Sequence, residues 1–131
     1  MHTHTNRLGI LAVALLLGLA ALAACGGGQA SSGDPAKGQQ VFANTGCVGC
    51  HTTGDQKLVG PGLAGLFKPG GPKLPSGIDY QGNLPNGKPI DEQNVKDWIK
   101  TGGVGKIGQM PGHTTLTPEQ MTDLVAYLKT L

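Results

Sequence analysis

Three residues, Cys47, Cys50 and His51, constrain this chain most, because together they form a C-x-x-C-H pattern. This spacing is typical of covalent haem attachment. Two thiols one short turn apart can each form a thioether with a vinyl group of the same porphyrin. The histidine that follows then lies under the iron, where an imidazole nitrogen can bind it. The pattern therefore predicts one covalently bound haem c and a fold that surrounds it.

The same residues allow three other interpretations: a local disulfide, a redox-active dithiol, or half of a zinc site. A dithiol oxidoreductase needs a βαβ context, which this chain with its 23 glycines does not show. A Cys₂His₂ zinc site would need His113 as its fourth ligand. None of the three explains why a histidine directly follows the second cysteine.

The third cysteine, Cys25, follows a segment with the features of an export signal. Residues 1–7 carry Arg7, and residues 8–21 form an uninterrupted run of apolar and small side chains. A membrane span needs about 20 residues, so this run is too short, and the mature chain is not expected to cross a membrane.

Residues 22–25 read Leu-Ala-Ala-Cys and resemble the lipobox of bacterial lipoproteins. In such proteins cleavage occurs before the cysteine, whose sulfur receives a diacylglyceryl group. We therefore expect residues 1–24 to be a signal peptide that is removed, and Cys25 to be lipidated. The alternative is ordinary cleavage after Ala23, which would leave Cys25 as an unpaired thiol in an oxidising compartment.

Removal of the first 24 of the 131 residues would leave 107, enough for one small domain. With one Trp, two Tyr and two Phe, the polypeptide alone would bury little apolar area, and a covalently held porphyrin would supply the missing core. The ten basic residues less Arg7 leave nine lysines against eight acids, a net charge of +1. This balance does not suggest a nucleic-acid partner.

A first helix is predicted after Asp34, an N-cap that is followed by Pro35 at the first helical position. It should end at Gly46, just before the C-x-x-C-H pattern. Gly38 inside this helix costs helix stability, and close approach of a second helix is a physical reason for a glycine there.

Two more helices are predicted nearer the C-terminus. Asp91 caps a helix over residues 92–101, and Gly102-Gly103 stops it. Residues 117–120 form a capping box, after which apolar residues at 121, 124, 125 and 128 define one helical face.

Other segments are predicted to be irregular. Residues 26–33 form a flexible Gly/Ser-type linker. Residues 68–90 contain ten Pro and Gly residues, which predicts a long ordered loop around the cofactor, with a disordered insertion as the alternative for its first half. Residues 60–65 match G-x-G-x-x-G, but no strand precedes them, so this is not a dinucleotide site.

The iron needs a second axial ligand or an open position, and the candidates are Met110, Met121 and His113. Met121 lies on the apolar stripe of the last helix, where a methionine usually fills the core. Met110 lies in an irregular segment from which its side chain can be aimed across the haem, and Pro111 stiffens that turn. His113 would give a bis-histidine haem instead.

The order of short elements along residues 34–131 resembles that of a class I cytochrome c. These elements are Gly38 and Phe42 in the first helix, the C-x-x-C-H pattern, residues 59–63, Trp98-Ile99, Met110-Pro111 and residues 124–128. The chain is also similar to the haem domain fused to some bacterial cytochrome oxidase second subunits, which share the Trp-Ile and Met-Pro elements.

The resemblance implies a small all-α fold of about three to five helices, in which the first and last helices cross near Gly38 and Tyr127. It further implies that Cys47 and Cys50 carry the thioethers and that His51 and Met110 bind iron. The Pro61 carbonyl would accept a hydrogen bond from the other nitrogen of His51. The long segment 68–90 departs from the family pattern, and Tyr80, Asn83 and Trp98 are only candidates for holding the propionates.

With both axial positions filled by protein atoms, the haem would change oxidation state without binding substrate. We therefore expect a monomeric, membrane-anchored monohaem carrier of single electrons rather than an enzyme. It would be exposed on the periplasmic side of a bacterial envelope, between respiratory or photosynthetic complexes such as a terminal oxidase and a quinol-oxidising complex. The alternatives are a fixed haem subunit of a larger respiratory complex and a peroxidase-like enzyme with His113 as its distal residue.

Overall fold

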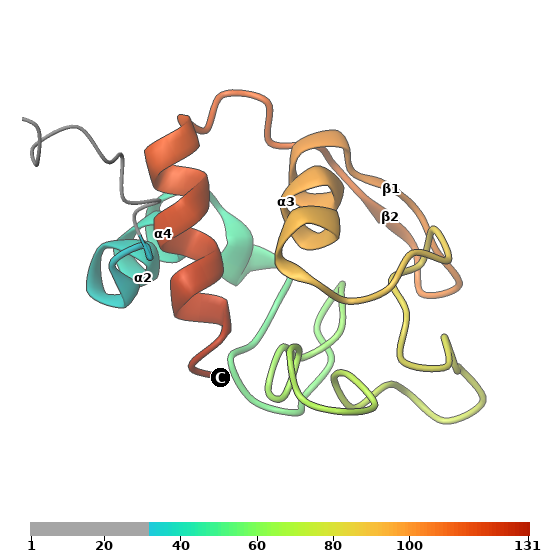
Figure 1. Ribbon diagram of the computed structural model, residues 1–131. Coiled ribbons are helices and arrows are strands. Elements are labelled where there is room, and N and C mark those ends of the chain that lie inside the picture. The colour runs from blue at the N-terminus through green and yellow to red at the C-terminus, as the bar shows by residue number, and fades with distance from the viewer. Residues whose placement is uncertain (1–31) are drawn as a thin grey trace, which may run out of the picture. The chain divides into compact units, whose positions relative to one another are not determined.

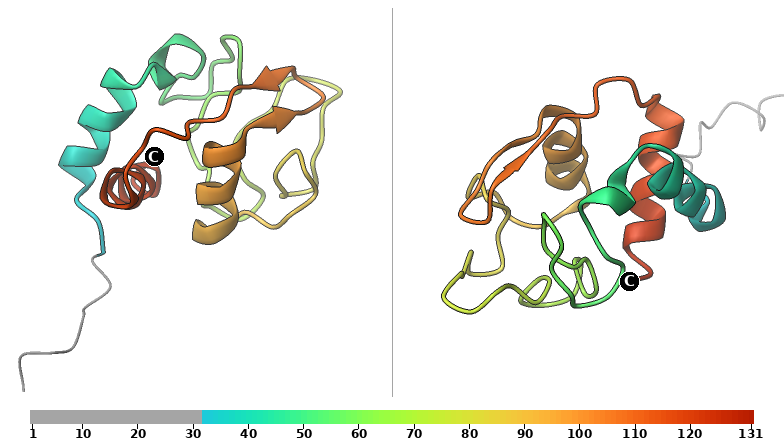
Figure 2. Two further views of the ribbon diagram at one scale, coloured as in Figure 1. Left: turned by 90° about the horizontal axis from the view of Figure 1, so that it is seen from above. Right: turned by 180° about the vertical axis from the view of Figure 1, so that it is seen from behind.

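The computed structural model describes residues 32–131. The predicted signal peptide, Cys25 and nearly all of the linker lie outside these residues. The described elements are α2 (Pro35–Asn44), the 3-10 helix η2 (Cys47–Gly49), α3 (Glu92–Thr101), β1 (Gly103–Val104), β2 (Gln109–Met110) and α4 (Pro118–Leu128). Figures 1 and 2 show α2 and α4 side by side, with α3 and the two strands on the other side of α4.

The first helix begins and ends as its sequence predicts. The Asp34 carboxylate accepts hydrogen bonds from the backbone N–H groups of Ala36 (2.8 Å) and Lys37 (3.3 Å). These are donors that the helix itself cannot satisfy. The helix ends at Asn44, and Gly46 turns the chain with a φ of +85°, a conformation that favours glycine.

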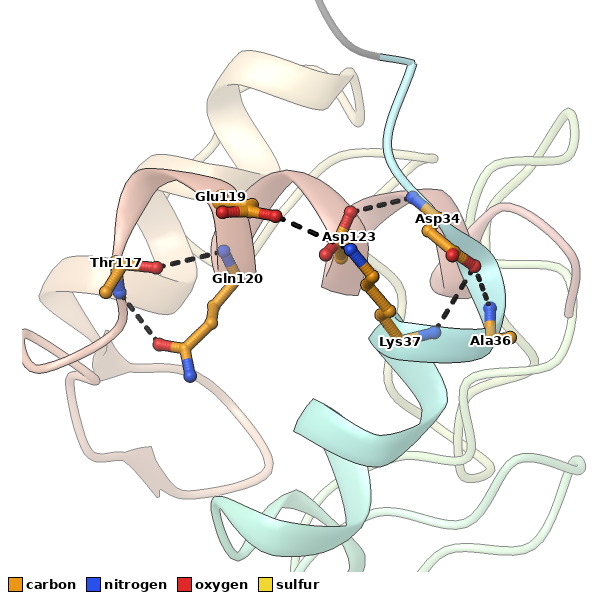
Figure 3. A network of polar contacts seen from close by, with 7 residues as sticks. All are labelled: Asp34, Ala36, Lys37, Thr117, Glu119, Gln120 and Asp123. Carbon is orange, nitrogen blue, oxygen red and sulfur yellow. Dashed lines mark hydrogen bonds and ion pairs between the residues drawn. The ribbon is translucent and has the colours of Figure 1, made fainter.

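The other two predicted helices are also confirmed. Asp91 accepts from the backbone N–H of Asn94 and begins α3, and Gly102, with a φ of +64°, ends it. At the start of α4, Thr117 and Gln120 exchange side-chain to backbone hydrogen bonds of 3.1 and 3.0 Å, which is a complete capping box (Figure 3).

The crossing of α2 and α4 depends on Gly38. A Cβ atom at this position would lie 2.0 Å from the backbone oxygen of Asp123 and 2.7 Å from the Cβ of Tyr127. The rings of Phe42 and Tyr127 pack beside it, with centroids 5.8 Å apart. The crossing that the resemblance implies, near Gly38 and Tyr127, is therefore confirmed.

Two polar contacts link α4 to the first turn of α2 and its N-cap (Figure 3). The buried carboxylate of Asp123 on α4 accepts a 2.7 Å hydrogen bond from the backbone N–H of Asp34. Lys37 on α2 lies 3.6 Å from the carboxylate of Glu119. Both contacts fix where the chain enters the domain.

The buried apolar core draws on all three α-helices and on the segment between η2 and α3. Its members are Val41, Phe42, Leu63, Leu66, Leu84, Val95, Ile99, Met121, Leu124, Val125 and Leu128. An ion pair between Lys129 and Glu92 links the end of α4 to the start of α3. The hydrogen bond and positive charge of Lys129 lower the pKa of the Glu92 carboxyl.

One expectation about local structure was wrong. Met110 lies on a strand rather than in an irregular segment, because Gly103 pairs with Met110 and Val104 with Gln109 in an antiparallel ladder. Each strand has two residues, too few for apolar and polar side chains to alternate visibly in the sequence.

The fold is thus mostly helical, as predicted, with three α-helices, one 3-10 helix and this small ladder in residues 32–131. Residues 68–90 contain turns and an isolated bridge between Asn83 and Pro89, but no helix or ladder strand. Within the described part of the chain, no helix is long and apolar enough to cross a bilayer.

Candidate cofactor site

A large cleft opens between the helices, the β-ladder and segment 68–90. It encloses about 1260 Å³ of space between atoms, part of it open to solvent. Pockets for small molecules and cofactors are lined mainly by apolar side chains, and this cleft has that character. Its apolar lining includes Phe42, Leu66, Ile99, Leu124 and Leu128.

Cys47, Cys50 and His51 all line this cleft. They lie on one tight turn, in which the Cys47 carbonyl accepts from the N–H groups of Cys50 (3.1 Å) and His51 (2.9 Å). Both thiols are free and half-buried, so the structure contains no local disulfide between them. Residues 32–131 also contain no group of three or more His, Cys, Asp and Glu side chains placed to hold a metal ion, which disfavours the zinc interpretation.

The imidazole of His51 is held in one orientation. Its Nδ1 lies 2.8 Å from the carbonyl oxygen of Pro61. A carbonyl can only accept, so Nδ1 carries the proton and the lone pair remains on Nε2, which is free to bind a metal. The contact that the resemblance implies is thus present.

Gly60 has a role in this site that we did not predict. A Cβ at Gly60 would lie 2.4 Å from His51 Cε1, and the Gly60 N–H donates to the Cys50 carbonyl at 2.8 Å. The backbone at Gly60 therefore packs directly against the ring. The repeated glycines of residues 60–65 were the available signal, but a single sequence does not say which glycine faces the histidine.

Of the three candidates for the second axial ligand, Met110 lines the cleft together with His51. Met121 is buried in the core, as its position on the apolar face of the last helix predicts. It is not among the residues of the described chain that line the cleft. His113 is likewise absent from that lining, and its backbone N–H donates to the Ile99 carbonyl at 2.9 Å. The geometry therefore favours Met110.

The three candidates for propionate contacts, Tyr80, Asn83 and Trp98, also line the cleft. Tyr80 is already engaged, because its hydroxyl oxygen accepts a 2.6 Å hydrogen bond from the backbone N–H of Lys106. A phenol that accepts one hydrogen bond can still donate its own proton. No sequence pattern predicts the contact between Tyr80 and Lys106, which lies 26 residues further along the chain.

The residues of the cleft fit a haem. Two free thiols one turn apart, an imidazole with an available Nε2 and a thioether sulfur all line a single apolar cavity. Apolar walls suit a porphyrin, the two thiols match the two covalent attachment points of a c-type haem, and the imidazole and the thioether match its two iron ligands.

Comparison with known proteins agrees with this geometry. The cytochrome c family model matches residues 35–131. A similar protein is the cytochrome c oxidase subunit 2 of Alkalihalophilus pseudofirmus, which is 31% identical over 99 residues; the match covers 72% of this chain and 25% of that protein. The chain thus spans about a quarter of the length of that relative. With Cys47 and Cys50 on a single turn of the cleft, this chain belongs to the cytochrome c family of electron carriers and binds haem c covalently.

Proposed function

We propose that this cytochrome c is a membrane-anchored carrier of single electrons between respiratory, or photosynthetic, membrane complexes. The observation that carries the proposal is that His51 and Met110 line one cleft. Both axial positions can then be filled by side chains of this chain. Haem iron with both axial positions filled by the protein exchanges electrons without binding a substrate.

In this proposal Cys47 and Cys50 form the two thioethers, and His51 and Met110 are the axial ligands. The bound haem supplies a one-electron ferric/ferrous couple. Pro61 keeps the imidazole of His51 oriented, since its carbonyl accepts the Nδ1 proton at 2.8 Å. The thioether of Met110 favours ferrous iron and raises the reduction potential relative to bis-histidine ligation, which suits delivery of electrons to an oxidase.

The partners we propose are a terminal oxidase as acceptor and a quinol-oxidising complex as donor. Similarity to an oxidase subunit supports the first of these. Exposed lysines between the haem motif and Met110 would meet acidic partner surfaces: Lys57, Lys68, Lys73, Lys88, Lys100 and Lys106. The same similarity supports one alternative, in which the chain is a fixed haem subunit of a larger complex. A peroxidase-like role has less support, because His113 is not part of the described cleft lining.

The proposed anchor is a lipid on Cys25, with residues 1–24 as the removed signal peptide, residues 26–33 as the linker and residues 34–131 as the cytochrome c domain. A flexible linker of this length spans about 15 Å on average and cannot exceed roughly 28 Å. The domain would therefore work close to the bilayer, where tethering raises the effective concentration of membrane-bound partners.

We expect Met110→Ala to abolish the weak near-infrared charge-transfer band of the ferric protein, because that band arises from sulfur ligation. The iron should become open to cyanide. Met121→Ala is the matched control, and should cost about 2–5 kcal/mol of stability, as for other buried methionines, while leaving the spectrum unchanged. Absorption spectra of the purified ferric variants measure both effects. A band that survives in Met110→Ala would exclude Met110 as the ligand and leave Met121 as the remaining thioether, whereas a wild-type ferric protein that lacks the band would make His113 the leading candidate.

We expect Cys25→Ser to move the protein from the membrane fraction to the soluble fraction with its haem spectrum unchanged, because serine has no sulfur to receive the lipid. Electron delivery to the membrane oxidase should slow, and added salt should slow the remaining activity because it screens the lysines. Fractionation and oxygen uptake by washed membranes measure these effects. If Cys25→Ser stays on the membrane after a high-salt wash, tight association with a larger complex is the better account.

A further inference from the structure

Met110 is carried by a small β-ladder that needs support from outside itself. β1 and β2 contribute two residues each. They are joined by a turn in which Gly105 and Gly108 exchange backbone hydrogen bonds of 2.8 and 3.2 Å. A two-stranded hairpin is marginally stable on its own, so its position in the fold depends on the contacts at its two ends.

One end of the ladder is fixed against α3. A Cβ at Gly102 would lie 2.3 Å from the backbone oxygen of Met110, and a Cβ at Gly103 would lie 2.6 Å from the ring of Trp98. The backbone of the ladder therefore packs directly on the C-terminal end of the helix.

The other end, the turn, is fixed by segment 68–90. The Tyr80 hydroxyl oxygen accepts the backbone N–H of Lys106 at 2.6 Å, and Lys106 Nζ donates to the Asp79 carbonyl at 2.8 Å. The same ammonium lies 5.5 Å from the centroid of the Tyr80 ring, within range of a cation–π attraction. A Cβ at Gly105 would lie 2.7 Å from the Tyr80 hydroxyl oxygen and 2.8 Å from the Cβ of Pro85.

Tyr80 is itself held in place. It is half-buried and lines the cleft. Beside it, Gln81 has a φ of +54°, and its backbone N–H donates to the side chain of Asp79, which closes a tight turn around Tyr80. The turn of the ladder thus meets a preformed site on segment 68–90.

We propose that Tyr80 is a positioning residue for the axial methionine. Its hydroxyl holds the backbone of Lys106, and thereby keeps the ladder that carries Met110 closed over the cleft. This inference rests on the proposed role of Met110 as an iron ligand. It assigns a function to segment 68–90: the segment restrains the ligand from the side opposite α3.

The test is Tyr80→Phe, which keeps the ring in the cleft and removes the acceptor. Loss of this hydrogen bond should make states in which the ladder opens roughly twofold to tenfold more populated. We expect the rate at which cyanide binds the ferric protein to rise by that factor while the near-infrared band is retained. Hydrogen exchange of the Lys106 amide should accelerate by the same factor.

Tyr127→Phe is the matched control, because it makes the same chemical change on α4, where the ring packs on Phe42. It should leave both rates unchanged. Lys106→Met provides a second variant: it removes the contact with the Asp79 carbonyl, keeps the backbone N–H, and should raise the cyanide rate about threefold or less.

The proposal is overturned if Tyr80→Phe and Lys106→Met both bind cyanide at the wild-type rate, or if Tyr127→Phe accelerates binding as much as Tyr80→Phe does. A cyanide effect in Tyr80→Phe without faster exchange of the Lys106 amide also overturns it, since contact with a propionate would then be the only role of the hydroxyl. Met110→Ala distinguishes this failure from failure of the proposed function, because only in the latter case do the wild-type protein and Met110→Ala have the same near-infrared spectrum.

Discussion

Replacing Gly38 with alanine should lower the free energy of unfolding of the holoprotein by about 3 kcal/mol or more. The new Cβ would lie 2.0 Å from the backbone oxygen of Asp123, a distance that no side-chain rotation can relieve. The two helices would have to separate, and Phe42 and Tyr127 would lose their contact. Overpacking commonly costs about 1–3 kcal/mol, and a clash with rigid backbone places this substitution above that range, so the roughly 1 kcal/mol that alanine gains over glycine in a helix does not offset it.

Thermal unfolding followed by circular dichroism measures this effect. For a domain of about 100 residues, 3 kcal/mol corresponds to a fall of roughly 12–24 °C in Tm. Gly54→Ala is the control, since a Cβ at Gly54 meets nothing within 4 Å and its φ lies outside the range that favours glycine. A Gly38→Ala protein as stable as Gly54→Ala would mean that α2 and α4 do not cross as closely as the structure has them.

The helices of this fold could be predicted from short-range chemistry. Asp34, Asp91 and Thr117 each precede a helix and each accept a backbone N–H at its first turn. Capping depends on residues within three or four positions of one another, so a single sequence contains the whole signal. The turn that holds Cys47 and Cys50 was predictable for the same reason, because the two cysteines lie three positions apart.

Other features depend on contacts between distant residues, and these could not be predicted. The β-ladder pairs two strands of two residues each, and Tyr80 meets Lys106 across 26 positions. Neither contact has a periodicity or a spacing that the sequence displays. Gly38 is an intermediate case, because a glycine in a helix indicates that another segment packs closely against it but does not identify that segment.

The choice among axial ligands shows how the two kinds of information combine. Sequence alone left Met110, Met121 and His113 as candidates. The helical stripe argued against Met121, and the structure places that residue in the core. Between Met110 and His113 the Met-Pro element of the family resemblance favoured Met110, and in the structure Met110 lines the cleft whereas His113 is not among the described lining residues.

Replacing both Cys47 and Cys50 with alanine should leave little or no holoprotein. Each single variant should retain at most a haem held through one thioether. The cleft is lined largely by apolar side chains and is partly open to solvent, so these side chains would be exposed to water if the cofactor were absent. The remaining core is small for a domain of this size, so the polypeptide needs the cofactor to fold stably.

Intact mass and acid-acetone extraction measure this directly. Wild-type protein should have the mass of the processed chain plus one haem, and the haem should stay with the polypeptide after extraction. Val48→Ala is the matched control, because Val48 lies between the two cysteines, is 49% exposed and contributes no thiol. It should give normal holoprotein. Haem that passes into the acetone from wild-type protein, or a double cysteine variant that accumulates as much stable holoprotein as Val48→Ala, would contradict covalent attachment at this turn. In the second case axial ligation by His51 and Met110, together with the apolar walls, would have to retain the cofactor alone.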